Sequence, residues 1–172
     1  MSAEEIRAAV AAVRDPEIRV VTIAELGILR EVSVDDDGTT AVTITPTYVG
    51  CPAMDTIRSD IHRAARSAGA GDIRVDTVWS PAWSTRWIGA GARAKLAAAG
   101  IAPPGDTPEP AAAAPTGTRL LPLTVTARPA AAPDCPRCGG AAEQLARFGS
   151  TACKSLWRCT RCGEPFDHFK EH

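Results

Sequence analysis

The sequence predicts an α+β fold, in which a small domain with a three-stranded sheet and flanking helices precedes a short cysteine-rich ribbon. Residues 40–45 and 73–79 alternate apolar with polar side chains, as half-buried strands do, and residues 28–34 begin another strand. Beyond Cys51, apolar side chains recur at helical spacing. Two C-x-x-C pairs, separated by twenty residues, then follow near the carboxyl end.

The composition of the chain excludes several classes of protein. Its 172 residues are 45% hydrophobic and can bury a core, and the length is compatible with one or two domains. A net charge of −1 gives no electrostatic reason to expect nucleic-acid binding. No apolar run approaches the roughly 20 residues that span a bilayer, and no signal-peptide core is present, so we expect a cytoplasmic protein with no membrane partner. There, six cysteines indicate metal binding or redox chemistry.

The amino-terminal segment predicts a short helix followed by a turn with two carboxylates. Residues 2–5 have the form of a capping box, and the apolar side chains after them lie on one helical face. Asp15-Pro16-Glu17 then ends the helix, because Pro16 disfavours helical backbone at Asp15. Asp15 and Glu17 are solvated turn residues unless the fold brings them close to Cys51.

A β-hairpin is predicted next, between residues 28–34 and 40–45. The turn between them is Asp35-Asp36-Asp37-Gly38. These aspartates lack the spacing and the closing glutamate of a calcium loop, so they indicate a solvated hairpin tip.

Cys51 lies where the strand at residues 40–45 gives way to a helix. Pro52 suits the first helical position, so Cys51 should lie at or next to the helix N-cap. Unpaired backbone N–H groups and the helix dipole there favour a thiolate, the form that binds metal or attacks an electrophile. The alternative is that Cys51 is a small apolar side chain packed beneath the helix.

The helix after Cys51 should end near Ser67, and residues 73–79 should form the third strand. Ser84 or Thr85 can then cap a further helix that reaches about Ala98. Trp83 and Trp87 could form an aromatic lid over the Cys51 loop or a surface that faces a partner. Alternatively, they close the core of a domain with few other aromatic residues.

Composition divides the chain into residues 1–101, a linker at 102–133 and a ribbon at 134–172. Proline, alanine, glycine and threonine dominate the linker, which predicts an extended, semi-rigid segment. The apolar run at residues 120–125 is the exception and could pack as an edge strand.

Four cysteines in the ribbon have the spacing of a structural zinc site. They are Cys135, Cys138, Cys159 and Cys162. Each pair precedes a glycine and can form a tight knuckle, and four thiolates complete a tetrahedral shell with no open position for hydrolytic catalysis. Iron in the same ligands and disulfides are the alternatives. Cys153 falls outside this set and is either a packed thiol or a sulfur that faces a partner.

Two groups of motifs resemble known families. The first comprises Asp15-Pro16-Glu17, Leu26-Gly27, Thr45-Pro46-Thr47-Tyr48-Val49-Gly50-Cys51-Pro52-Ala53-Met54 and Pro81-Ala82-Trp83. With it, the chain resembles the SufT-like domain of iron–sulfur cluster assembly factors. The second comprises Phe148-Gly149-Ser150-Thr151-Ala152-Cys153-Lys154-Ser155 and Glu164-Pro165-Phe166-Asp167. With both, it resembles the D component of the bacterial phenylacetyl-CoA epoxidase system.

This resemblance implies a SufT-like α+β domain, a zinc ribbon and an accessory role in aerobic phenylacetate breakdown, with the oxygenase chemistry on other subunits. The chain agrees, because it has no paired Glu-x-x-His motifs, dinucleotide-binding glycines or flavin motif. The implied partners are the other subunits, especially the iron–sulfur reductase subunit, and the ribbon would dock the client.

The resulting hypothesis is that Cys51 transiently holds iron or an iron–sulfur cluster, which could be shared across a homodimer. The residues implied to handle iron with it are Asp15, Glu17 and Thr47. One alternative is a non-catalytic adaptor that bridges oxygenase and reductase, with Cys51 only packed. A thiol-dependent enzyme is disfavoured, because no histidine accompanies Cys51 in a plausible base position.

Overall fold

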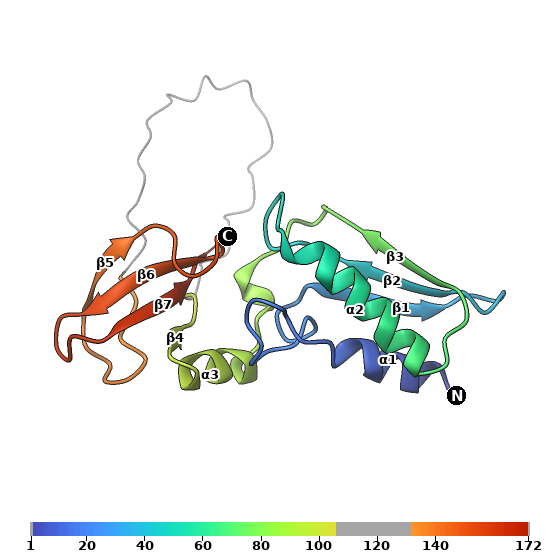
Figure 1. The fold of residues 1–172 in the computed structure, drawn as a ribbon, viewed down its shortest axis with the longest axis horizontal. Helices are drawn as coiled ribbons and strands as arrows, with labels where there is room; N and C mark the ends of the chain where they lie inside the picture. Colours follow the sequence, from blue (N-terminus) through green and yellow to red (C-terminus); the bar gives the residue numbers. More distant parts are fainter. Residues whose placement is uncertain (1, 106–131, 172) are drawn as a thin grey trace, which may run out of the picture.

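The computed structural model describes residues 2–105 and 132–171. Residues 2–105 form the first unit and residues 132–171 form the ribbon, and the last strand of the first unit pairs with the ribbon sheet (Figure 1). The predicted apolar run at residues 120–125 and most of the predicted linker lie outside the described residues. No helix in the described parts of the chain has the length and apolar content needed to cross a bilayer.

The first unit contains the predicted three-stranded sheet. β1 (Leu29–Val34) and β2 (Thr40–Ile44) form the expected antiparallel hairpin, and β3 (Ile73–Thr77) pairs with β2. The β2–β3 pairing is parallel, because the helix between these strands returns the chain to the edge where β2 began. Cys51 therefore lies beyond the end of the central strand.

Two helices pack on this sheet and on each other (Figure 1). α1 (Ala3–Ala11) has the predicted capping box, in which the Ser2 and Glu5 side chains each accept a backbone N–H. α2 (Ala53–Ser67) turns Ile57 and Ile61 into the core. The core thus fixes the start of α2, and with it the loop that carries Cys51.

The single helix predicted from Ser84 or Thr85 to about Ala98 is wrong. Thr85–Trp87 form a one-turn 3-10 helix, η1, and α3 (Ala90–Ala98) begins after a break in which Ile88 and Gly89 are extended. Arg93 stabilises the break, because its guanidinium donates to the carbonyl oxygens of Ile88 and Thr85, each at 3.1 Å.

The ribbon is a four-stranded sheet, and one of its edge strands comes from the end of the first unit. β5 (Ala142–Ala146), β6 (Lys154–Cys159) and β7 (Pro165–Phe169) are antiparallel, and β4 (Ile101–Ala102) adds to β7 in parallel. The boundary predicted at residue 101 therefore falls inside a strand of the ribbon sheet.

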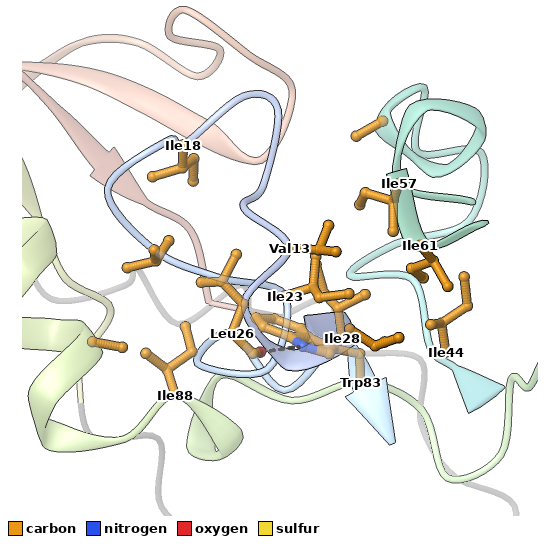
Figure 2. Packing of buried hydrophobic residues seen from close by; sticks show 14 of the residues in the cluster. Val13, Ile18, Ile23, Leu26, Ile28, Ile44, Ile57, Ile61, Trp83 and Ile88 are labelled. Atoms are coloured by element: carbon orange, nitrogen blue, oxygen red, sulfur yellow. Dashed lines mark hydrogen bonds between the residues drawn. The ribbon is translucent and has the colours of Figure 1, made fainter. Parts of the chain in front are cut away.

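Trp83 and Phe169 join the cores of the two units. Trp83 is 5% exposed, and its ring centroid lies 5.9 Å from that of Phe169. Its indole N–H donates to the Leu26 carbonyl at 2.9 Å, in the middle of the buried side chains (Figure 2). Burial places Trp83 in the core rather than on a surface that faces a partner.

Trp87 is half-buried and packs against the turn at Gly27. The Arg30 guanidinium lies 3.8 Å from its ring centroid. A Cβ at Gly27 would lie 2.5 Å from the Trp87 Cβ, so only glycine fits there, and its φ of 72° also favours glycine.

Candidate functional site

The ribbon brings its four predicted ligands together at one point. The sulfur atoms of Cys135, Cys138, Cys159 and Cys162 all lie within 4.8 Å of one another. The Cys135–Cys162 and Cys138–Cys159 sulfur pairs are separated by 3.9 and 3.5 Å. An ion bound by four sulfurs at about 2.3 Å holds them about 3.8 Å apart, so the set fits a tetrahedral zinc ion.

Backbone geometry supports this site at both knuckles. Gly139 and Gly163 have φ values of 65° and 76°, and each donates its N–H to the carbonyl of the first cysteine of its pair. The backbone N–H groups of Arg161 and Cys162 donate to the Cys159 sulfur, each at 3.4 Å. These bonds stabilise a thiolate and orient it towards the ion.

The turn at Asp15 and Glu17 lies beside Cys51, although the two segments are far apart in the sequence. Asp15 is buried, and its Oδ1 accepts the N–H groups of Glu17 at 2.9 Å and Ile18 at 2.7 Å. Burial nevertheless raises the pKa of this carboxyl group above its ordinary value. Asp15 therefore holds the shape of the turn, while the half-buried Glu17 is left to face the two cysteines described below.

Cys51 is half-buried immediately before Pro52, the N-cap of α2. Burial raises the pKa of its thiol, and the nearby carboxylates of Glu17 and Asp15 raise it further. The N–H of Ala53 and the Tyr48 hydroxyl act in the opposite direction, but they do not overcome burial. Burial and the two carboxylates therefore oppose the thiolate that the helix terminus favours.

Tyr48 belongs to the site, although the sequence did not single it out. Burial raises its pKa to about 12, and the nearby charges of Cys51 and Glu17 raise it further. It is the one tyrosine of the chain and lies three residues before Cys51, which is the feature of the sequence that could have identified it. Thr47 lies half-buried in the same loop.

Cys153 is buried and directed at the first unit rather than at a partner. Its thiol donates to Glu17 Oε2 at 3.8 Å, and its sulfur lies 3.0 Å from Thr151 Oγ1. The next residue, Lys154, is also buried, and its ammonium group lies 3.6 Å from the Asp167 carboxylate. Its positive charge also acts on Asp15. The ribbon thus contributes both a sulfur and a cation to the site around Glu17.

Replacing Glu17 with glutamine should make Cys51 react faster with an alkylating reagent. The Glu17 carboxylate raises the pKa of Cys51, so its loss lowers that pKa and increases the thiolate fraction at neutral pH. We expect several-fold faster alkylation of the peptide that contains Cys51, measured by mass spectrometry on the zinc-loaded chain. Glu31→Gln, at an exposed position on β1, is the control and should leave the rate unchanged.

Two family models match the chain. Residues 3–77 match the model of an iron–sulfur cluster assembly protein, and residues 122–170 match that of the PaaD zinc beta ribbon domain. The first covers the turn at Asp15 and Glu17 and the Cys51 loop, and the second covers the four ribbon cysteines and Cys153.

Relatives cover either the whole chain or its first unit. A Bacillus subtilis (strain 168) protein named Fe-S protein maturation auxiliary factor YitW is 38% identical over 82 residues, 47% of this chain and 79% of its own length. A crystal structure of a DUF59 domain from Bacillus anthracis covers 54% of this chain and 89% of its own, at 32% identity and a TM-score of 0.49.

One relative extends across both units. The Escherichia coli (strain K12) protein assigned as the D component of 1,2-phenylacetyl-CoA epoxidase is 39% identical over 167 residues, which cover 96% of this chain and 91% of that protein. The chain therefore belongs to the family of phenylacetyl-CoA epoxidase D components, in which an iron–sulfur assembly domain is joined to a zinc ribbon.

Proposed function

We propose that this protein is a maturation factor of a phenylacetyl-CoA epoxidase system in phenylacetate catabolism, and that Cys51 handles iron or an iron–sulfur cluster as its cargo. The client would be the oxygenase–reductase complex, with the iron–sulfur reductase subunit as the main partner. The protein itself would be an accessory subunit and not an enzyme.

One observation carries the proposal: Cys51 is a half-exposed thiol with the carboxylate of Glu17 beside it, in a unit that matches an iron–sulfur assembly model. A half-buried thiol near carboxylates attracts a cation and exchanges its proton for the metal. The relative from Bacillus subtilis, whose name states a role in Fe-S protein maturation, matches about half of this chain, the length of this unit.

The zinc site would keep the ribbon folded for contact with a partner and would take no part in the chemistry. Four cysteines complete the shell of its zinc ion, so no coordination position is left for a substrate. Close to the Cys153 turn it presents Phe148, which is 68% exposed and has the Lys170 ammonium 4.0 Å from its ring centroid. An exposed aromatic side chain of this kind is typical of a contact with another protein.

Cys51→Ser should lower the iron content of the reductase subunit that is produced beside it. A serine hydroxyl is a much weaker ligand for iron than a thiolate, so we expect loading to fall by about tenfold or more. The experiment expresses the variant in cells that lack the native copy, purifies the reductase without exposure to oxygen, and measures iron and acid-labile sulfide.

Val49→Ala is the matched control in the same loop. Val49 is 83% exposed and contributes no ligand atom, so this variant should load the reductase normally. Full loading by Cys51→Ser would refute the cargo role. If that variant still co-purified with the epoxidase subunits, the adaptor alternative would replace it.

A further inference from the structure

The ribbon contains one sulfur that its zinc site does not use. Cys153 is 5% exposed and packs with the core of the first unit, whereas Cys135 and Cys159 pack in the separate core of the ribbon. Its turn is held by several bonds: Gly149 donates to the Lys154 carbonyl at 2.8 Å, and Lys170 donates to the Cys153 carbonyl at 3.0 Å. Cys153 is therefore held in a fixed position against the first unit.

The fixed position directs Cys153 at the carboxylate that also acts on Cys51. Its thiol donates to Glu17 Oε2 at 3.8 Å. Burial raises the pKa of Cys153 to about 11, and Glu17 and Asp15 raise it further, as they do for Cys51. The charges of both sulfurs and of Glu17 also raise the pKa of Tyr48. The carboxylates of Glu17 and Asp15 thus act on two thiols from different units, and the Lys154 ammonium opposes them at Cys153.

We propose that Cys51, Cys153 and Glu17 form a single intramolecular ligand set for a thiophilic divalent cation, which we take to be ferrous iron. This inference rests on the proposed function and adds to it the second sulfur, which the ribbon supplies. Thiolates and carboxylates both bind iron in proteins, and three ligands leave a further position open for transfer to a client.

The binding step balances in charge and needs no oxidant. Ferrous iron forms bonds to the sulfurs of Cys51 and Cys153 and to an oxygen of Glu17, and the two thiols release their two protons to solvent. Iron stays in the ferrous state throughout. The net charge of the three ligands and what they bind does not change, because the two positive charges of the ion replace two protons.

The side chains must close around the ion. Within residues 2–105 and 132–171, only the four zinc ligands place three or more ligand atoms within 4.8 Å of one another. Cys153 and Glu17 are already in contact, so closure around the ion requires Cys51 to approach them. It lies in the loop between β2 and α2, where Gly50, with a φ of 84°, allows a tight turn.

A ligand set within one chain and a site shared across a homodimer differ in the number of iron ions bound per chain. The zinc-loaded full chain, titrated with ferrous iron alone under anaerobic conditions, should bind one iron per chain. Iron-edge X-ray absorption, which does not see the zinc site, should find two sulfur ligands. Cys51→Ser and Cys153→Ser should each weaken iron binding by about tenfold or more and leave one sulfur on the iron.

Glu17→Gln should also weaken iron binding, while Glu31→Gln should not. The zinc content of each variant reports whether its ribbon is folded. If Cys153→Ser lost its zinc, the sulfur count of the unmodified protein would decide the question alone.

Other outcomes separate this inference from the proposed function. One sulfur on the iron of the unmodified protein, or unchanged binding by Cys153→Ser, would overturn the shared ligand set. The cargo role would survive that result if Cys51→Ser still abolished binding and reductase loading. One iron per two chains, each contributing Cys51, would favour the homodimer and would also overturn the inference.

Discussion

Removal of zinc from the full chain should unfold the ribbon. The buried core of this unit is small and includes two of the four ligands, Cys135 and Cys159. So little apolar surface cannot offset the entropy of ordering the strands, whereas structural zinc contributes about 10–16 kcal/mol in zinc-finger peptides. After chelation, we expect the amide NMR signals of β5, β6 and β7 to collapse to unfolded positions.

Cys159→Ser should reproduce this result without a chelator. The Cys159 sulfur accepts two backbone N–H groups in addition to its place in the quartet. Cys51→Ser is the matched control, since it removes a thiol outside the quartet and should keep zinc at the unmodified level. Dispersed signals from β6 and β7 in a chain shown by mass spectrometry to lack zinc would contradict the prediction.

Phe169→Ala should separate the ribbon from the first unit. Phe169 is 1% exposed and packs on Trp83 at the junction of the two cores. Truncating a buried phenylalanine typically costs about 3–5 kcal/mol, because the transfer free energy is lost and a cavity remains. We expect a decrease of that size in the free energy of unfolding, measured by denaturant titration of the zinc-loaded chain.

A second measurement distinguishes separation from general loss of stability. Cys153 is buried against the core of the first unit, so its alkylation should accelerate if Phe169→Ala releases the ribbon with the zinc retained. Phe148→Ala truncates an exposed phenylalanine and should change the free energy of unfolding by less than about 0.5 kcal/mol. A similar effect of both variants would argue against Phe169 as the anchor.

Local signals in the sequence predicted most of the fold. The turn at Asp35 to Gly38 indicated the hairpin, the apolar spacing after Cys51 indicated α2, and the knuckle spacing indicated the zinc ligands. Tertiary contacts decided the rest. The break before α3 depends on Arg93 reaching the carbonyls of Ile88 and Thr85, and neither the spacing nor the capping signal contains that contact.

The sequence predicted Cys51 and the turn at Asp15 and Glu17 as members of the candidate site, but it did not predict Tyr48, Cys153 or Lys154. The turn at Asp15 and Glu17 was expected to matter only if it lay near Cys51, and the fold places it there. Helix position alone favoured a thiolate, but burial and the two carboxylates oppose it, and both depend on the fold. Cys153 and Lys154 reach the site through tertiary contacts, namely the β4–β7 pairing and the packing of Phe169 in the core of the first unit.

The β4–β7 pairing has a consequence for insertions and deletions between the two units. Pro103, Pro104 and Gly105 line one cavity together with Ala132, Pro133 and Asp134, so the chain leaves the first unit and enters the ribbon at the same place. The β4–β7 pairing and the contact of Phe169 with Trp83 both hold the ribbon against the first unit. A change in the number of residues between Gly105 and Ala132 should therefore leave the contact between Cys153 and Glu17 in place.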